Sequence, residues 1–380
     1  MACDGSNNFG DSRLTSLDAI RGFVMFWIIG GGAMVTTAAE ASNWGPLSSV
    51  AEQCRHVKWA GFTFWDLIMP LFLFVVGTAI PFSLAKRISR GDNKTQVYLR
   101  IARRVVLLWL LSLLAKGELQ KFDLTNMHFF TGVLQAIAVG YLVAAVIVLN
   151  MNVRGQLLIL AGLLLLYWAI VALVPVPGFG RADYSLEGNA VTYIDGIVLG
   201  SLQRGTAFRV VSCLTQGCTV LLGALAGQLL RTNNSQKQKL LWLFTAGLVC
   251  VGAGIVWSLW LPVIKKIWTS SFVLYSAGYC FGLLGLFYFI IDVLKFRRWA
   301  FGFVVIGTNA IAVYVATRLF DFRLIADAFV AGKSFIVDTP TGGLVALVGP
   351  WGPFVRELTA FIIVWLILLY MYRKKTFVKV

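Results

Sequence analysis

The sequence predicts an all-α, polytopic membrane protein, a bundle of about ten helices that span a bilayer with little mass outside it. Of its 380 residues, 58% are hydrophobic and only 13% are charged, whereas a soluble domain carries roughly 25% charged residues. Apolar runs long enough to cross a membrane recur along the whole chain. The Lys and Arg behind the net charge of +16 lie in short loops between these runs. That placement indicates membrane orientation and argues against nucleic-acid binding.

The predicted spanning segments follow from helix geometry, because about 20 apolar residues at 1.5 Å each cross the hydrocarbon layer. They are residues 15–36, 62–84, 98–116, 131–150, 155–174, 208–230, 240–261, 271–294, 299–319 and 354–372. Residues 1–12 form a polar tail that lacks the basic and apolar regions of a cleaved signal peptide. Residues 13–380 form a single transmembrane domain.

The dense basic clusters at 86–104 and 373–379 predict that both ends of the chain face the cytosol. The loops at 37–61, 175–207 and 320–353 then lie outside. They are unusually long, and loops of that length in a compact protein are functional or disordered. Their content of Trp, Tyr and Phe favours an ordered outer lid.

His56 and Asp66 are the strongest candidates for chemistry. His56 ends an outer loop just before the second spanning segment, and histidine suits general-base or nucleophilic work near neutral pH. The alternative is that His56 is an interfacial histidine with no functional role. Asp66 lies about one turn inside an apolar run, where a carboxylate needs a partner. Either His56 or the backbone at the helix end supplies it, so Asp66 either orients the histidine or has only a structural role at the terminus of the helix.

Two further groups carry charge at opposite ends of the bundle. Asp18 and Arg21 have the i,i+3 spacing of an ion pair near the cytosolic end of the first segment, and form an anion site or a packing contact. Lys265 and Lys266 lie at the outer mouth beside Trp268. These three residues could bind an acidic group and stack on a sugar ring, or belong to the basic and aromatic belt at the interface.

Asn309 is a polar side chain inside the ninth apolar segment, where it lines a pocket or holds helices together. The six cysteines have no metal-ligand spacing, so no metal is expected.

The order of five motifs resembles the transmembrane heparan-α-glucosaminide N-acetyltransferase family, bacterial-type members included. The resemblance covers nearly the whole chain from Arg13. The motifs that carry it are RLTSLDAIRG at 13–22, the stretch 56–77 with its FWDLIMP core at 64–70, GVLQ at 132–135, KKIWTSS at 265–271 and GTNA at 307–310. The chain departs from the family pattern at Ala136, at 204–208 and at Gly30–Gly32.

The resemblance implies that domain 13–380 is an acyltransferase with His56 as its active-site histidine. Such an enzyme takes acetyl from cytosolic acetyl-CoA, as co-substrate, and places it on the amine of an amino sugar or glycan on the outer or periplasmic side. It implies a multi-pass protein of a bacterial inner membrane, with the lipid bilayer as a partner and a homodimer as its assembly.

Two other functions fit the same residues. A secondary transporter for a sugar or an anionic metabolite would also use broken helices and intramembrane charges. An acyltransferase that uses a longer acyl chain or a hydroxyl acceptor is the third alternative.

Overall fold

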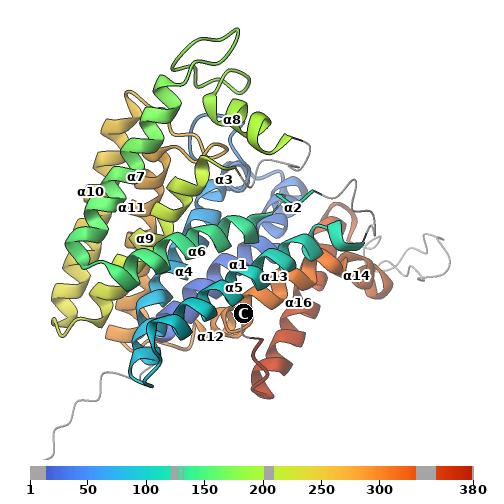
Figure 1. Ribbon diagram of the computed structural model, residues 1–380. Helices are drawn as coiled ribbons and strands as arrows, with labels where there is room; N and C mark the ends of the chain where they lie inside the picture. The colour runs from blue at the N-terminus through green and yellow to red at the C-terminus, as the bar shows by residue number, and fades with distance from the viewer. Residues whose placement is uncertain (1–13, 121–127, 131, 201–208, 331–347, 379–380) are drawn as a thin grey trace, which may run out of the picture.

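The computed structural model describes residues 14–120, 128–130, 132–200, 209–330 and 348–378, and these are helical apart from loops and two isolated bridges. Long helices form a bundle, and shorter ones lie at both of its ends and within it (Figure 1). The long helices are α1 Thr15–Phe26, α2 Gly32–Ser42, α4 Phe64–Ile88, α5 Lys94–Ala115, α6 Val133–Asn150, α7 Val153–Leu173, α9 Ser212–Arg231, α10 Gln236–Ser258, α11 Ser270–Phe287 and α16 Gly352–Arg373. The shorter ones are α3 Gly45–Gln53, α8 Ala190–Val198, α12 Phe301–Gly307, α13 Ala310–Leu319 and α14 Phe322–Val330. Single π-turns and 3₁₀ turns are η1 Trp27–Gly31, η2 Glu118–Gln120, η4 Tyr288–Val293 and η5 Gly349–Trp351.

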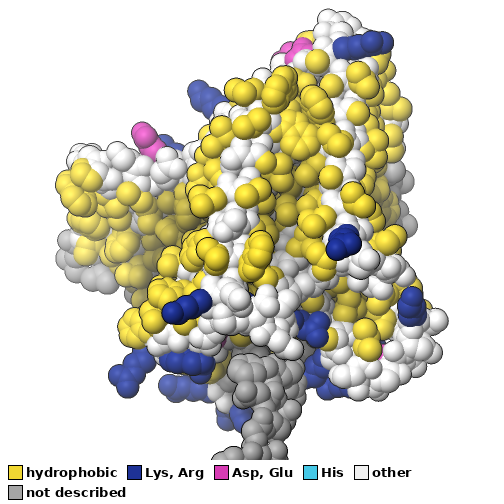
Figure 2. Space-filling model, turned by 90° about the vertical axis from the view of Figure 1, so that its left-hand side faces the viewer, with side chains coloured by type: hydrophobic (Ala, Val, Ile, Leu, Met, Phe, Trp, Pro, Cys, Tyr) yellow, Lys and Arg dark blue, Asp and Glu magenta, His cyan; other side chains and the backbone are white. Residues whose placement is uncertain are grey.

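The predicted fold class is confirmed. Within the described residues, eight helical segments are long and apolar enough to cross a membrane, and α12 with α13 makes a ninth if this pair, bent by 73°, is one span. The segment predicted at 98–116 lies in α5 but is not among them. Arg100, Arg103 and Arg104 in its first half leave too few uncharged residues in a row. The chain is a multi-pass integral membrane protein, and hydrophobic side chains cover most of the face in Figure 2, with Lys and Arg gathered toward its ends.

Close helix contacts at small residues hold the centre of the bundle together. A Cβ atom added to Gly77 of α4 would lie 2.0 Å from the Val220 carbonyl oxygen of α9. One added to Gly223 of α9 would lie 1.9 Å from the Phe74 oxygen of α4. Only glycine permits this backbone approach, the usual means of packing helices in a membrane, where water does not drive association.

Both ends of the described chain lie at one end of the bundle, as the basic clusters predict. The Ser16 N–H at the start of α1 donates to Asp292, 3.3 Å away in η4. Asn309, at the break between α12 and α13, bonds to the backbone of Thr376 and Val378. We call this the inner end and the end where α4 begins the outer end, following the predicted orientation.

The outer loops are ordered where the structure describes them. The loop before α4 contacts the outer loop between α7 and α8, because the Trp59 indole N–H donates to the Tyr184 carbonyl oxygen at 2.7 Å. It also contacts the loop between α10 and α11, where the Gly61 N–H donates to the Val263 oxygen at 2.9 Å. The 37–61 loop contains α3, the 175–207 loop contains α8 and the 320–353 loop contains α14. Residues 201–207 and 331–347 of the predicted lid lie outside the described part.

Candidate functional site

Asp66 occupies the third position of α4 and accepts hydrogen bonds from the turn that precedes the helix. The Thr63 hydroxyl lies 2.9 Å from Asp66 Oδ2, and the backbone N–H groups of Thr63 and Val57 each donate to the same oxygen at 3.3 Å. This is a capping box, which stabilises the first turn by satisfying its free N–H groups. The Asp66 side chain is 1% exposed, so a buried carboxylate is held at the positive end of the helix dipole.

His56 is the hydrogen-bond partner that Asp66 requires. The His56 Nδ1 and Asp66 Oδ1 atoms are 2.7 Å apart. A carboxylate only accepts, so Nδ1 carries a proton, and in the neutral ring Nε2 then has the free lone pair. The His56 side chain is 54% exposed. The pair therefore presents an oriented proton acceptor at the surface of a cavity, with its orienting carboxylate buried beneath it.

Lys265 completes the cluster from a distant part of the chain. Its Nζ lies 3.3 Å from Asp66 Oδ1 and 3.3 Å from His56 Nδ1. Because Nδ1 uses its proton for Asp66, we assign the lysine contact to the carboxylate. Burial lowers the pKa of Lys265 to about 8, against the opposing effect of the Asp66 charge. The cluster thus holds a cation that can lose its proton at mildly alkaline pH.

A cavity of about 320 Å³ adjoins the cluster and reaches into the bundle. The side chains of α1, α4 and α6 form its apolar part, among them Met25, Phe72 and Ile137. The rings of Trp59 and Trp65 line its outer part. Its volume, apolar walls and few convergent polar groups are those of a small-molecule site. We call this space the outer cavity.

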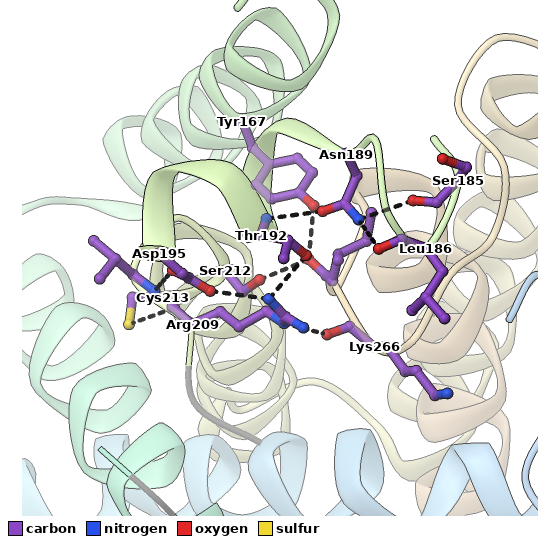
Figure 3. Close-up of polar contacts among 12 residues, drawn as sticks. Tyr167, Ser185, Leu186, Asn189, Thr192, Asp195, Arg209, Ser212, Cys213 and Lys266 are labelled. Atoms are coloured by element: carbon purple, nitrogen blue, oxygen red, sulfur yellow. Dashed lines mark hydrogen bonds and ion pairs between the residues drawn. The ribbon is translucent and has the colours of Figure 1, made fainter. Parts of the chain in front are cut away.

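Arg209 is a cavity-lining residue that sequence reasoning did not single out. It is only 6% exposed, and its Nη1 lies 3.0 Å from the Asp195 carboxylate of α8. Its Nε–H donates to the Lys266 carbonyl oxygen at 3.1 Å (Figure 3). The signal available in the sequence was Asp195 within an otherwise apolar stretch, since such a carboxylate needs a cation.

The loop that carries Lys265 is held by further buried hydroxyl groups. The Ile267 carbonyl oxygen accepts from the Tyr167 hydroxyl and from the Ser212 hydroxyl, each at 2.6 Å (Figure 3). Together with Arg209, these bonds fix two successive carbonyl groups just after Lys265. The position of the lysine ammonium group beside Asp66 therefore depends on α7, α8 and α9.

The structure brings together some of the predicted site residues and separates others. His56, Asp66, Lys265, Lys266 and Trp268 all line the outer cavity. Trp268 is only 3% exposed, and its indole N–H donates to Thr219 at 3.1 Å. Its ring thus offers little surface for stacking on a sugar.

The remaining predicted site residues lie outside the outer cavity. Asp18 and Arg21 form the expected ion pair, 3.6 Å apart in α1, and Gly307 packs against the Asp18 carbonyl oxygen. Asn309 uses its amide for the backbone near the C-terminus. Within the ranges that the structure describes, no three His, Cys, Asp or Glu side chains gather closely enough to bind a metal ion.

Comparison with known proteins agrees with the family resemblance. Residues 13–195 match a family described as a domain of unknown function, DUF5009. The chain is similar in sequence to heparan-alpha-glucosaminide N-acetyltransferase. The human protein is 25% identical over an alignment of 372 residues, and the match covers 81% of this chain and 53% of the relative. The mouse protein is 24% identical over 326 residues, 70% of this chain and 49% of the relative.

The chain thus spans about half the length of the curated relatives it matches. The matches support a family relationship with proteins named as N-acetyltransferases.

Proposed function

We propose that this chain is a membrane-embedded acetyltransferase that moves acetyl from acetyl-CoA, bound from the cytosol, to the amine of an amino sugar on the outer side. The observation that carries the proposal is the 2.7 Å contact between His56 Nδ1 and the buried Asp66 carboxylate, beside a cavity of about 320 Å³. It leaves Nε2 of His56 as the proton acceptor. The relatives' name supplies the class of reaction and acceptor.

In direct transfer, His56 Nε2 removes a proton from the acceptor amine as its nitrogen attacks the thioester carbonyl carbon. The C–S bond then breaks, and the histidine returns the proton to the departing sulfur. Asp66 stabilises the imidazolium that exists between these events, as an orienting carboxylate does in hydrolytic triads. The products are an N-acetyl amide and free CoA, so protons and electron pairs balance.

The same geometry also supports a covalent route. Nε2 would attack the thioester carbon, and the thiolate would leave. The amine would then take the acetyl group as the C–N bond to histidine breaks, and its proton would pass through the freed Nε2 to the thiolate. Lys266 lines the cavity and is the cation assigned to the developing oxyanion. Asn309, the other residue considered for that role, is engaged at the inner end of the bundle.

The test is acetyl transfer by the protein purified in detergent, with radiolabelled acetyl-CoA and glucosamine as acceptor. We expect wild type to label glucosamine and His56→Ala to lose transfer while it still binds CoA. His128→Ala is the matched control, because His128 contacts Glu118 and does not line the outer cavity. Full activity of His56→Ala would refute the assignment. Label retained on wild-type protein without acceptor would favour the covalent route.

The transporter alternative has one structural feature in its favour, the 73° break between α12 and α13. Discontinuous helices of this kind form the substrate sites of many secondary transporters. In this chain the Asn309 side chain at the break binds the backbone near the C-terminus. Failure of wild type to bind or consume acetyl-CoA with a range of amino sugars would favour the transporter.

A further inference from the structure

A second cavity lies at the inner end of the bundle, and arginine dominates its lining. It has a volume of about 410 Å³ between the end of α4, the first half of α5 and α6. Four of its lining residues are Arg87, Arg100, Arg103 and Arg104, and Tyr141 closes one side. We call this space the arginine cavity.

The positive charge of this cavity is only partly balanced by protein groups. Asp92 pairs with Arg100 and lies 3.9 Å from Arg87. Among the residues placed by the structure, Arg103 and Arg104 have no acidic partner. Four guanidinium groups thus face one carboxylate, an excess of three positive charges. Such an excess in a concave site attracts anions strongly.

Arg104 also has a hydrogen-bond donor without an acceptor. Its guanidinium carbon lies 4.4 Å from the centroid of the Tyr141 ring, a cation–π contact that fixes the side chain. Its Nε–H is buried and has no partner within the described part of the chain. Buried polar groups in proteins are nearly always satisfied, so this donor calls for an acceptor that the described residues do not supply, either water or a ligand group.

The arginine cavity shares two helices with the outer cavity. On α6, Ile137 lines the outer cavity and Tyr141 lines the arginine cavity, one helical turn apart. On α4, Phe72 and Ser83 are the corresponding residues, separated by about 16 Å at 1.5 Å per residue. Asp66, the partner of His56, lies six residues before Phe72. A molecule with phosphates in the arginine cavity would therefore have to extend about 26 Å along α4 to place its other end beside His56.

We propose that the arginine cavity is a binding site for phosphate groups, held by the planar forks of Arg103 and Arg104. Guanidinium forms paired, charge-assisted bonds with phosphate oxygens, which a lysine cannot reproduce. Two phosphate sources share this chemistry, the phosphates of CoA and the headgroup of an anionic phospholipid. The assignment to CoA rests on the proposed function, and the phosphate site itself does not.

The experiment measures binding of CoA, pyrophosphate and pantetheine to the purified full-length chain, for wild type and Arg103→Gln/Arg104→Gln. We expect the double variant to lose at least about 10-fold in affinity for CoA and pyrophosphate, with no change for pantetheine, which has no phosphate. Arg103→Lys/Arg104→Lys should give intermediate values. Arg90→Gln is the matched control, a basic residue in the turn just after α4 that does not line the cavity.

Each outcome separates this proposal from the proposed function. Equal affinity of wild type and both double variants for CoA and pyrophosphate would overturn the phosphate site, as would a wild type that binds no phosphate ligand. Arginine-dependent binding of phosphatidylglycerol in nanodiscs, without CoA binding, would support the site and assign it to lipid, and the proposed function would fail. Loss of transfer from acetyl-CoA, with transfer from S-acetylpantetheine retained, would support both. Unfolding temperatures show whether the variants are folded. If the Arg103→Gln/Arg104→Gln variant does not fold, the same comparison is made with Arg103→Lys/Arg104→Lys.

Discussion

Substitution of Asp66 by Asn tests the central geometry most directly, because it keeps the size of the side chain and removes its charge. The Asn Oδ1 can still accept from the backbone N–H groups and the hydroxyl that bond to Asp66 Oδ2. Its NH₂ group then faces His56 Nδ1 and donates to it. That reversal places the histidine proton on Nε2, where it blocks proton acceptance from the acceptor amine.

The magnitude follows from the role that is lost. A positioned general base contributes about 10²–10⁴-fold, which corresponds to about 3–5 kcal/mol of barrier. We therefore expect kcat for acetyl transfer to fall by about 10²–10⁴ in Asp66→Asn, with CoA affinity unchanged. The substitution also removes the 3.3 Å ion-pair contact with Lys265. The pKa of Lys265 should then fall below about 8, since the charge of Asp66 is what raises it against burial.

The assay is the initial rate of transfer from radiolabelled acetyl-CoA over a range of pH and acceptor concentration. Glu40→Gln is the control, because Glu40, near the end of α2, forms an exposed pair with Arg55 at 3.5 Å. Such surface pairs contribute little, so its rate should match wild type. A transfer rate of Asp66→Asn within about threefold of wild type, far below the loss of a general base, would refute the role of the carboxylate.

Three further predictions concern the surroundings of the site and the bundle. Lys265 has a pKa of about 8 in the folded protein, below its ordinary value of 10.5. Between these two pH values the unfolded chain therefore binds more protons than the folded protein does. The contribution of Lys265 to the free energy of unfolding then rises with pH across that window. The unfolding temperature of wild type should therefore rise relative to Lys265→Met between about pH 8 and 10.5, and a parallel response of the two proteins would contradict the buried, depressed lysine. Arg209→Gln leaves the Asp195 carboxylate buried without its cation and should cost about 3–5 kcal/mol. Part of that loss should return in Arg209→Gln/Asp195→Asn, and equal unfolding temperatures of the single and double variants would show that the pair is not the cause. Gly77→Ala introduces a Cβ atom 2.0 Å from the Val220 carbonyl oxygen and should destabilise the protein by about 1–3 kcal/mol. Gly252→Ala, where nothing lies within 4 Å, should be near neutral in the same thermal unfolding experiment, and equal effects of the two changes would argue against the α4–α9 contact.

Much of the membrane architecture could be predicted from the sequence, because the requirement for long apolar helices in a bilayer is local. Nine of the ten predicted segments correspond to apolar helices or to the bent pair of α12 and α13. The segment at 98–116 is a helix too, α5, but it is not among the apolar helices, and three of its arginines line a cavity. The length of an apolar run gives no information on what arginines within it do. The fold shows that these arginines surround a concave space.

The sequence by itself determined that the chain crosses a membrane many times and that Asp66, one turn into an apolar helix, needs a partner. It also placed His56 beside that helix, because ten residues separate the two side chains. Only the tertiary structure decided that Lys265, 209 residues away, lies 3.3 Å from the same histidine. Likewise, only the fold brought Arg209 to Asp195 and four arginines from two helices around one space. The physical reason is that burial of a charge shows in local sequence, whereas the group that compensates it depends on how distant helices pack.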